Sequence, residues 1–429
     1  MHPRTVRRPV SRSQQAESPT SRRHRPDYWL VMLCAAMVGV GLIVVYSISP
    51  ALSAASGVSN SHYITKQLIA IGFAFMAFVA TSQIPLPVWR KFVKPMLAFA
   101  ALATVVALIM PVNPDYPAHR WVRLGSFSFQ SVEFVKFALL FALAGFLAAR
   151  AKANKLDDFK STLRPLIIAL VVVGLFIAGP QSIRAQSDLG SMGVMIAMFG
   201  TMCFVAGVNM KRLVLIGGLI AILAALVILP SAYRRDRVAT FLHPAANCQD
   251  SGYQACQALI AVGSGGLSGL GLGKSVQAYG YLPQAANDSI FAIYAEKFGF
   301  IGTVALLALL LTFFARMKSI VERAPDDFSR LLVSGVLAWL SVQSLINIGA
   351  MIGVLPLKGI TLPFISYGGT SIVFVTAAVG LVFQVSRYTV HTVPRVSNES
   401  VGKKGKSYDD SRDRRRLRGA YHPDLGSRL

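Results

Sequence analysis

The chain has 429 residues, of which 54% are hydrophobic and only 14% are charged, yet its formal net charge is +24. A soluble chain of this length would form two or three domains. The mean hydropathy of +0.53 and the long apolar segments exclude a soluble globular class and indicate a membrane protein. The excess of Lys and Arg lies in the ends of the chain and in short polar segments.

The first 28 residues are polar and contain seven arginines, with Ser, Pro and Gln between them. Because this stretch has neither an apolar core nor a small-residue cleavage site, it is not a signal peptide. Its composition predicts a disordered basic tail over residues 1–28.

Ten apolar segments follow, and each is near the roughly 20 residues that cross a bilayer as a helix. The sequence therefore predicts an all-α polytopic membrane protein, with its membrane domain over residues 29–388 and both termini on one side. The predicted spans are 29–49, 64–82, 92–111, 131–149, 164–180, 189–208, 212–230, 289–315, 329–355 and 363–386.

The charges of the connecting segments predict the orientation. The segments after spans two, four, six and eight are rich in Lys and Arg, and cytoplasmic loops carry this bias. Both tails are thus predicted to be cytoplasmic, and the large loop at 231–287, between spans seven and eight, to be extracytoplasmic. The C-terminal tail, 389–429, is predicted to be a disordered basic arm near anionic lipid headgroups. Nucleic-acid binding is the disfavoured alternative for that arm, since the chain is anchored in a membrane.

Cations in the predicted outer segments need their own explanation, because they oppose the usual bias. Arg120 lies in one outer loop, and Glu133 and Lys136 follow within span four, three residues apart on one helix face. Either these two form a buried ion pair that fixes helix packing, or they line an outward polar cavity for an anionic headgroup. Arg237 belongs to a second outer cluster, and guanidinium groups suit phosphate because they donate two parallel hydrogen bonds.

The segment at 251–275 is rich in glycine, but it is not a nucleotide-binding loop. A Walker A motif needs Gly where Ser268 stands, and no strand precedes the segment. We expect the glycines to allow tight turns and close approach to a bulky ligand, with Gln254 and Lys274 as hydrogen-bonding groups. Cys248 and Cys256 lie in the same external loop, where either a disulfide or two free thiols is consistent with the spacing.

Two carboxylates mark the start of span eight. Asp288 stands where the helix would enter the membrane, and Glu296 lies eight residues further on, so both can share one helix face. An acid at a membrane boundary is costly to desolvate and usually has a function. The alternative is that Asp288 caps the helix N-terminus.

A Pro- and Gly-rich segment at 343–371 joins spans nine and ten. Lys358 lies in this short outer loop, and Ser366 and Tyr367 follow as span ten enters the membrane. Glycine and proline in membrane helices can serve packing alone. These residues are nevertheless predicted to lie at the same membrane depth as Asp288.

The motifs as a set resemble the SEDS family (shape, elongation, division and sporulation), the glycan polymerases of bacterial cell-wall synthesis. The resemblance runs from about Asp27 to Arg387 and includes RWVRLGSFSFQ, SDLG, YLPQAANDSIF, AEKFGFIG and LPLKGITLPFISYGGTS. The lysine of LPLKG is more similar to the cell-division branch, FtsW, than to the elongation branch, RodA. Gln284 stands where the family usually has an acid, which makes Asp288 more singular.

The resemblance implies polymerisation of lipid II, an undecaprenyl-pyrophosphate-linked precursor, at the outer face of the bacterial cytoplasmic membrane. It also implies a class B penicillin-binding protein and other division proteins as partners, and a location at the division septum. Glycosyl transfer needs a base for the acceptor hydroxyl and cations for the leaving pyrophosphate. Asp288 is the candidate base. The candidate substrate-binding residues are Arg120, Glu133, Lys136, Arg237, Gln254, Lys274, Lys358, Ser366 and Tyr367.

Two other functions fit parts of the sequence. A transporter that moves the lipid-linked precursor would also use outer cations and helix-breaking glycines, but it needs polar residues along its whole path. A scaffold for division proteins would explain the tails but not the ions within the spans. No cofactor is expected and no metal-ligand cluster is evident, although a divalent cation bridging the pyrophosphate stays open.

Overall fold

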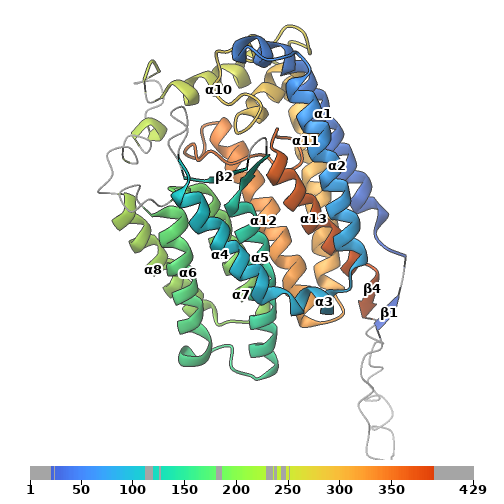
Figure 1. The fold of residues 1–429 in the computed structure, drawn as a ribbon, viewed down its shortest axis with the longest axis vertical. Coiled ribbons are helices and arrows are strands. Elements are labelled where there is room, and N and C mark those ends of the chain that lie inside the picture. The colour runs from blue at the N-terminus through green and yellow to red at the C-terminus, as the bar shows by residue number, and fades with distance from the viewer. Residues whose placement is uncertain are drawn as a thin grey trace, which may run out of the picture. The chain divides into compact units, whose positions relative to one another are not determined.

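The computed structural model describes residues 21–23, 25–111, 119–124, 127–179, 186–228, 235, 239–242, 248–250 and 252–390. These residues are mostly helical (Figure 1). Ten of the described helices coincide with the ten predicted spans. They are α1 (Tyr28–Ser56), α2 (His62–Gln83), α4 (Val93–Ile109), α5 (Ser131–Lys152), α6 (Arg164–Ala178), α7 (Leu189–Ala206), α8 (Met210–Ile228), α11 (Ile290–Glu322), α12 (Asp327–Met351) and α13 (Gly369–Val385).

Seven helices in the described part of the chain are long and apolar enough to cross a membrane, counting α6 with the π-helical turn Phe159–Leu163 before it. Helices α4 and α13 are shorter apolar helices of 17 residues each. The prediction of an all-α polytopic membrane protein is confirmed.

Helix α12 lies inside the bundle. It packs against α5, α7, α11 and α13, and 67% of the residues in its apolar stretch are buried. In α2, which packs mainly on α13, only 22% of the residues in the apolar stretch are buried. Large apolar side chains such as Phe75 on α2 and Leu215 on α8 are exposed. Lipid would cover such surfaces, since a helix satisfies its own backbone in a bilayer.

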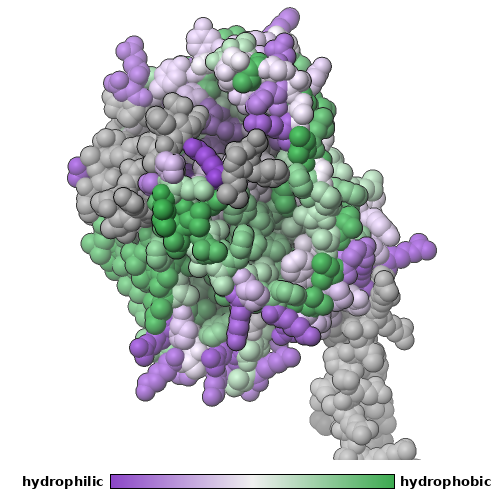
Figure 2. All heavy atoms as spheres, viewed as in Figure 1, coloured by the Kyte–Doolittle hydropathy of each residue, from purple (hydrophilic) through white to green (hydrophobic). Residues whose placement is uncertain are grey.

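Figure 2 shows an apolar band between two polar ends of the molecule. The short helix α3 (Leu86–Lys91), with Arg90 and Lys91 in its last turn, lies at the same end as β1 and β4 (Figure 1). Helix α10 (Tyr253–Ser264) lies at the opposite end. Strands β1 and β4, which adjoin the N- and C-terminal tails, therefore lie at the same end of the bundle as the basic residues of α3. An even number of spans places both tails at one end.

The inner parts of the two tails are more ordered than the composition predicts. Strand β1 (Ser21–Arg23) pairs with β4 (Tyr388–Val390) in an antiparallel sheet, although both fall in or beside stretches predicted to be disordered. Asp27 accepts a hydrogen bond from Leu30 N as the cap of α1 and forms a 2.8 Å ion pair with Arg316. Tertiary contacts between distant segments explain this difference. Residues 1–20 and 391–429, for which disorder was predicted, lie outside the described residues.

Two glycines of the loop before α11 lie directly against the backbone of that helix. A Cβ on Gly265 or Gly269 would collide with the backbone of α11, at Ala295 and Lys297 respectively. Gly299, with φ of +64°, interrupts α11 and approaches the backbone of Gly269 in turn. Close approach therefore occurs at these three glycines, and it is between the glycine-rich loop and α11.

The two cysteines of the loop between α8 and α11 are joined. Cys248 and Cys256 form a disulfide with a Cα–Cα distance of 5.6 Å, inside the range that a bridge allows. Because Cys256 lies on α10, the bridge ties this helix to the segment before it. Of the two states that the spacing left open, the structure has the disulfide.

Candidate active site

Asp288 lies half-buried in the turn that leads into α11. The N-cap residue of α11 is Ser289, and its side chain makes no capping hydrogen bond. Ser289 Oγ instead donates to the carbonyl of Pro283 at 2.9 Å and accepts from Gln254 Nε2 at 3.1 Å. By position, the N-cap residue is therefore Ser289, one residue after Asp288.

Gly359 brings Asp288 and Arg120 to one place. A Cβ added at Gly359 would lie 3.2 Å from Asp288 Oδ2 and 3.9 Å from Arg120 Nη1. The φ of +62° at Gly359 also favours glycine. A carboxylate and a guanidinium that are remote in sequence thus border the same small space, next to half-buried Lys358.

Backbone carbonyls orient the guanidinium. Arg120 directly precedes strand β2 (Trp121–Leu124), which forms a hairpin with β3 (Phe127–Gln130). Its Nε donates to the carbonyl of Gln186 and its Nη2 to that of Ser187, both at 3.0 Å. The fork geometry of a guanidinium then directs Nη1 toward Gly359.

The segment that holds Arg120 is itself anchored in the interior. Gln186, which is fully buried, donates to Ser131 Oγ at 2.7 Å. Asp188, only 1% exposed, caps α7 by accepting from Ser191 N at 3.0 Å. The SDLG motif therefore supports Arg120 through the backbone, a role that the sequence did not reveal.

Glu133 and Lys136 form a buried ion pair of 2.8 Å, with exposed fractions of 4% and 1%. Lys136 Nζ also donates to Gln343 Oε1 at 3.0 Å and lies 5.0 Å from the ring centroid of Trp339. This environment agrees with the interpretation of a buried ion pair. The lysine lies in the interior of the bundle, among side chains of α5 and α12.

Two amides of α12 hold the segments that form the site. Asn347 Nδ2 donates to the backbone carbonyls of Asp288 at 2.7 Å and Ile360 at 2.6 Å. One turn earlier, Gln343 Nε2 donates to the carbonyl of Thr361 at 3.0 Å. Sequence reasoning missed both residues. The available signal was a pair of amides four residues apart in an apolar span, where polar groups are rare.

Ser366 and Tyr367 lie beside the Asp288 segment, on the side of α13. Ser366 Oγ donates to the carbonyl of Asn287 at 2.7 Å, and Tyr367 N donates to that of Ala286 at 2.8 Å. Ser366 is buried and Tyr367 is half-buried. Both predicted residues thus contact the backbone next to Asp288.

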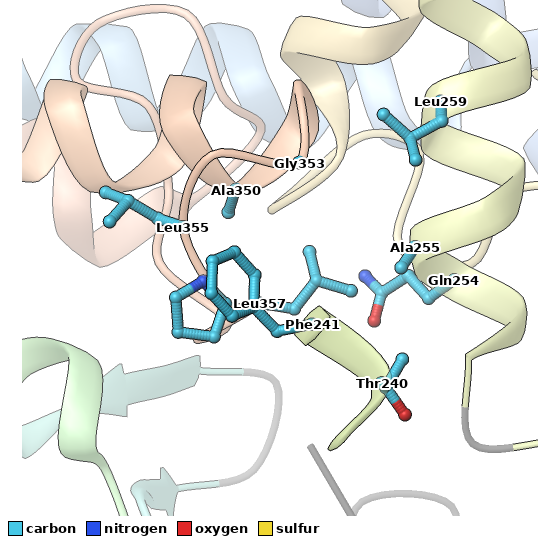
Figure 3. A pocket seen from close by; sticks show the side chains of 10 residues that line it. Thr240, Phe241, Gln254, Ala255, Leu259, Ala350, Gly353, Leu355 and Leu357 are labelled. Carbon is cyan, nitrogen blue, oxygen red and sulfur yellow. The ribbon is translucent and has the colours of Figure 1, made fainter. Parts of the chain in front are cut away.

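A pocket opens between α10 and the α12–α13 connection (Figure 3). Thr240 and Gln254 supply its polar side chains. Its apolar lining includes Phe241, Leu259, Leu355 and Leu357. Gln254 links this pocket to the Asp288 segment through Ser289. The site therefore has an apolar side next to its charged groups.

The remaining candidates lie apart or outside the described residues. Lys274 is exposed in the glycine-rich loop. Arg237 is not among the described residues. Within the described part of the chain, no three His, Cys, Asp or Glu side chains are grouped as ligands of a metal ion.

Residues 28–391 match the family described as "Cell cycle protein", which comprises FtsW, RodA and SpoVE. A probable peptidoglycan glycosyltransferase FtsW of Coxiella burnetii is 34% identical over 371 residues, which are 85% of this chain and 96% of the relative. Stage V sporulation protein E of Bacillus subtilis is also 34% identical, over 86% of this chain and 99% of the length of the Bacillus protein.

Solved structures agree with these relatives. RodA of Thermus thermophilus has a TM-score of 0.61 at 27% identity and covers 84% of this chain and 97% of its own. A chain from a peptidoglycan synthase complex that coordinates polymerization and crosslinking has a TM-score of 0.67 at 26% identity, covering 84% and 98%. Sequence and fold are similar over the whole helical bundle, and the chain belongs to the FtsW/RodA/SpoVE (SEDS) family.

Proposed function

We propose that this protein is a peptidoglycan glycosyltransferase that polymerises lipid II. Family membership and the names of its relatives support the reaction class. The observation that carries the proposal is the junction at Gly359, where Asp288 Oδ2 and Arg120 Nη1 border one space at the end of the bundle. The adjacent pocket offers apolar surface of the kind that a lipid-linked substrate needs.

In the proposed reaction, a sugar hydroxyl of the acceptor attacks the anomeric carbon of the donor. A carbon–oxygen bond forms there, and the bond from the same carbon to the pyrophosphate breaks. Asp288 accepts the hydroxyl proton as general base, which contributes typically 10²–10⁴-fold to a rate. The electron pair leaves on the pyrophosphate, whose negative charge Arg120 and Lys358 stabilise. A divalent cation that bound together with the substrate would supply further positive charge for the leaving group.

The other candidate residues take supporting roles in this proposal. Lys136 is enclosed with Glu133 and Gln343, so it acts by holding the interior rather than by contacting the leaving group. Gln254 borders the pocket and orients the substrate there. Arg237 and Lys274 are assigned to attraction of the anionic substrate, and Ser366 and Tyr367 to the support of the Asp288 segment.

The site is assigned to the extracytoplasmic face, and both termini to the cytoplasm. The Lys/Arg-rich connections support this orientation, because they flank the end of the bundle opposite to α10. Reporter fusions after residue 250 and at the C-terminus test it. We expect opposite sides for the two fusions, and a shared side would contradict the ten-span topology.

A class B penicillin-binding protein is the proposed partner, and the division septum is the proposed location. The relatives named FtsW favour the division branch over the elongation branch. The likeness to a chain of a complex that couples polymerization with crosslinking supports a crosslinking partner.

Polymerisation of lipid II by the purified full-length chain, alone and with such a partner, tests the function. We expect glycan chains in detergent solution in at least one of the two conditions. A lipid transporter would leave lipid II unpolymerised in both, yet move it across the bilayer of a vesicle, so the same preparation separates these alternatives.

A further inference from the structure

Asn347 occupies a singular position in the interior of the bundle. Its side chain is 2% exposed, and its single amide nitrogen donates to the carbonyls of Asp288 and Ile360. One of these is the backbone of the proposed base, and the other belongs to the residue after Gly359. Each hydrogen atom of the amide group can serve one carbonyl, so one side chain joins the two segments.

Gln343 extends this connection along α12. Its amide nitrogen donates to the carbonyl of Thr361, and its oxygen accepts from Lys136 Nζ and from Trp339 Nε1 at 2.9 Å. The loop that carries Gly359 is therefore attached to α12 at two successive residues. Since α12 is largely buried within the bundle, both attachments start from a rigid element.

We propose that Asn347 is a positioning residue that sets the location of the Asp288 carboxylate relative to Gly359 and Arg120. The inference rests on the proposed function, in which Asp288 is the base. Asn347 lies behind the backbone of both segments, so it acts through them and not on the substrate. Without its amide, two carbonyls lose a donor in a buried site, and one of the attachments that hold the turn of Asp288 against the Gly359 loop is lost.

The test uses Asn347→Leu, which has a similar volume and no donor, in the full-length chain. Displacement of a catalytic group by about 1 Å can reduce a rate 10²-fold, so we expect kcat to fall roughly 10–100-fold. The apparent KM for lipid II should change little. Asn347→Ser keeps one donor, and we expect its kcat to lie between those of the wild type and Asn347→Leu. If the leucine variant is not inserted into the membrane, the serine variant provides the test.

The pH profile separates positioning from a loss of folded protein. The acid limb of kcat reports the base in the substrate complex. Asp288 Oδ2 and Arg120 Nη1 both lie close to Gly359, and a second cation, Lys358, directly precedes that glycine. A carboxylate that moves away from a cation is protonated more easily, so the acid limb should move to higher pH. A folding defect alone lowers the plateau and leaves the limb in place.

Ser344→Ala is the matched control. Ser344 is 3% exposed on the same helix, but among the described residues its hydroxyl bonds to the carbonyl of Leu340 alone, within that helix, at 2.8 Å. We expect its kcat and acid limb to equal those of the wild type. Equal losses in the Ser344 and Asn347 variants, or an unchanged profile for folded Asn347→Leu, would overturn the inference.

Asp288→Asn, measured in parallel, keeps the two proposals distinguishable. If it is inactive while folded Asn347→Leu behaves as wild type, the base proposal stands and the positioning role is wrong. If Asp288→Asn polymerises normally, the proposed mechanism is wrong, and the positioning role falls with it.

Discussion

Asp288 and Glu296 are eight residues apart, and they occupy opposite kinds of environment. Glu296 is 1% exposed, and its carboxylate accepts from Ser275 Oγ at 2.5 Å, Val276 N at 2.8 Å and Gln277 N at 3.2 Å. Asp288 is half-buried and has the glycine gap at residue 359 beside its Oδ2.

The difference shows how a fold separates a structural acid from a chemical one. Three donors from one loop surround the carboxylate of Glu296. That arrangement leaves the acid committed to holding the loop against α11. Asp288 instead lies in the turn before α11, where the Gly359 loop and Arg120 converge.

Replacement of the proposed base should have the largest effect on activity. Asp288→Asn keeps the size of the side chain, and we expect the variant to fold and to bind its partner. Polymerisation of lipid II should fall by roughly 10²–10⁴-fold, because an amide does not accept the hydroxyl proton. Normal glycan synthesis by a well-expressed variant would show that the carboxylate is not the base.

Filling the gap should have the next largest effect. In Gly359→Ala the added methyl group lies between Asp288 and Arg120, and a left-handed backbone adds roughly 1–2 kcal/mol of strain. We expect polymerisation to fall about 10–100-fold, as for other small displacements of reacting groups. The measurement is the initial rate per folded molecule.

Gly57→Ala is the control for backbone strain alone. Its φ of +65° is close to that of Gly359, and nothing lies within 4 Å of the added Cβ. If both alanine variants lose the same activity, strain explains the loss and the gap has no role.

Glu296→Gln should affect stability more than chemistry. The amide reverses the polarity at one of the two oxygens and removes the charge that the three donors face. We expect a free energy of unfolding lower by about 1–3 kcal/mol, visible as reduced abundance and a lower Tm. The rate per folded molecule should stay near that of the wild type. A loss of rate without a loss of stability would show that Glu296, like Asp288, takes part in the reaction.

The disulfide should give the smallest effect on catalysis, because it lies outside the Asp288 junction. In intact cells, Cys248 and Cys256 should react with a membrane-impermeant thiol reagent only after the disulfide has been reduced. The buried residues Cys34 and Cys203 should stay unlabelled in both conditions. Equal labelling before and after reduction would mean that no bridge forms in the cell.

The ten helices could be predicted because apolar length alone specifies a membrane span, wherever the helix sits in the bundle. The pairing of Glu133 with Lys136 was predicted for a similar reason, since residues three apart on a helix are neighbours whatever surrounds them. Asp288 was singled out because an acid at a membrane boundary is rare. All three depend on local spacing or on the solvent around the chain.

What only the tertiary structure decided is which distant residues meet. The contacts of Arg120 with Gln186 and Ser187, and of Asn347 with Asp288 and Ile360, join segments 13 to 67 residues apart. They depend on how the helices and the loops between them pack, and no periodicity in the sequence encodes this. The partners of the glycines in the loop before α11 could not be predicted either, because a glycine permits close approach without specifying what approaches it. Here packing decided that the partner was the backbone of α11.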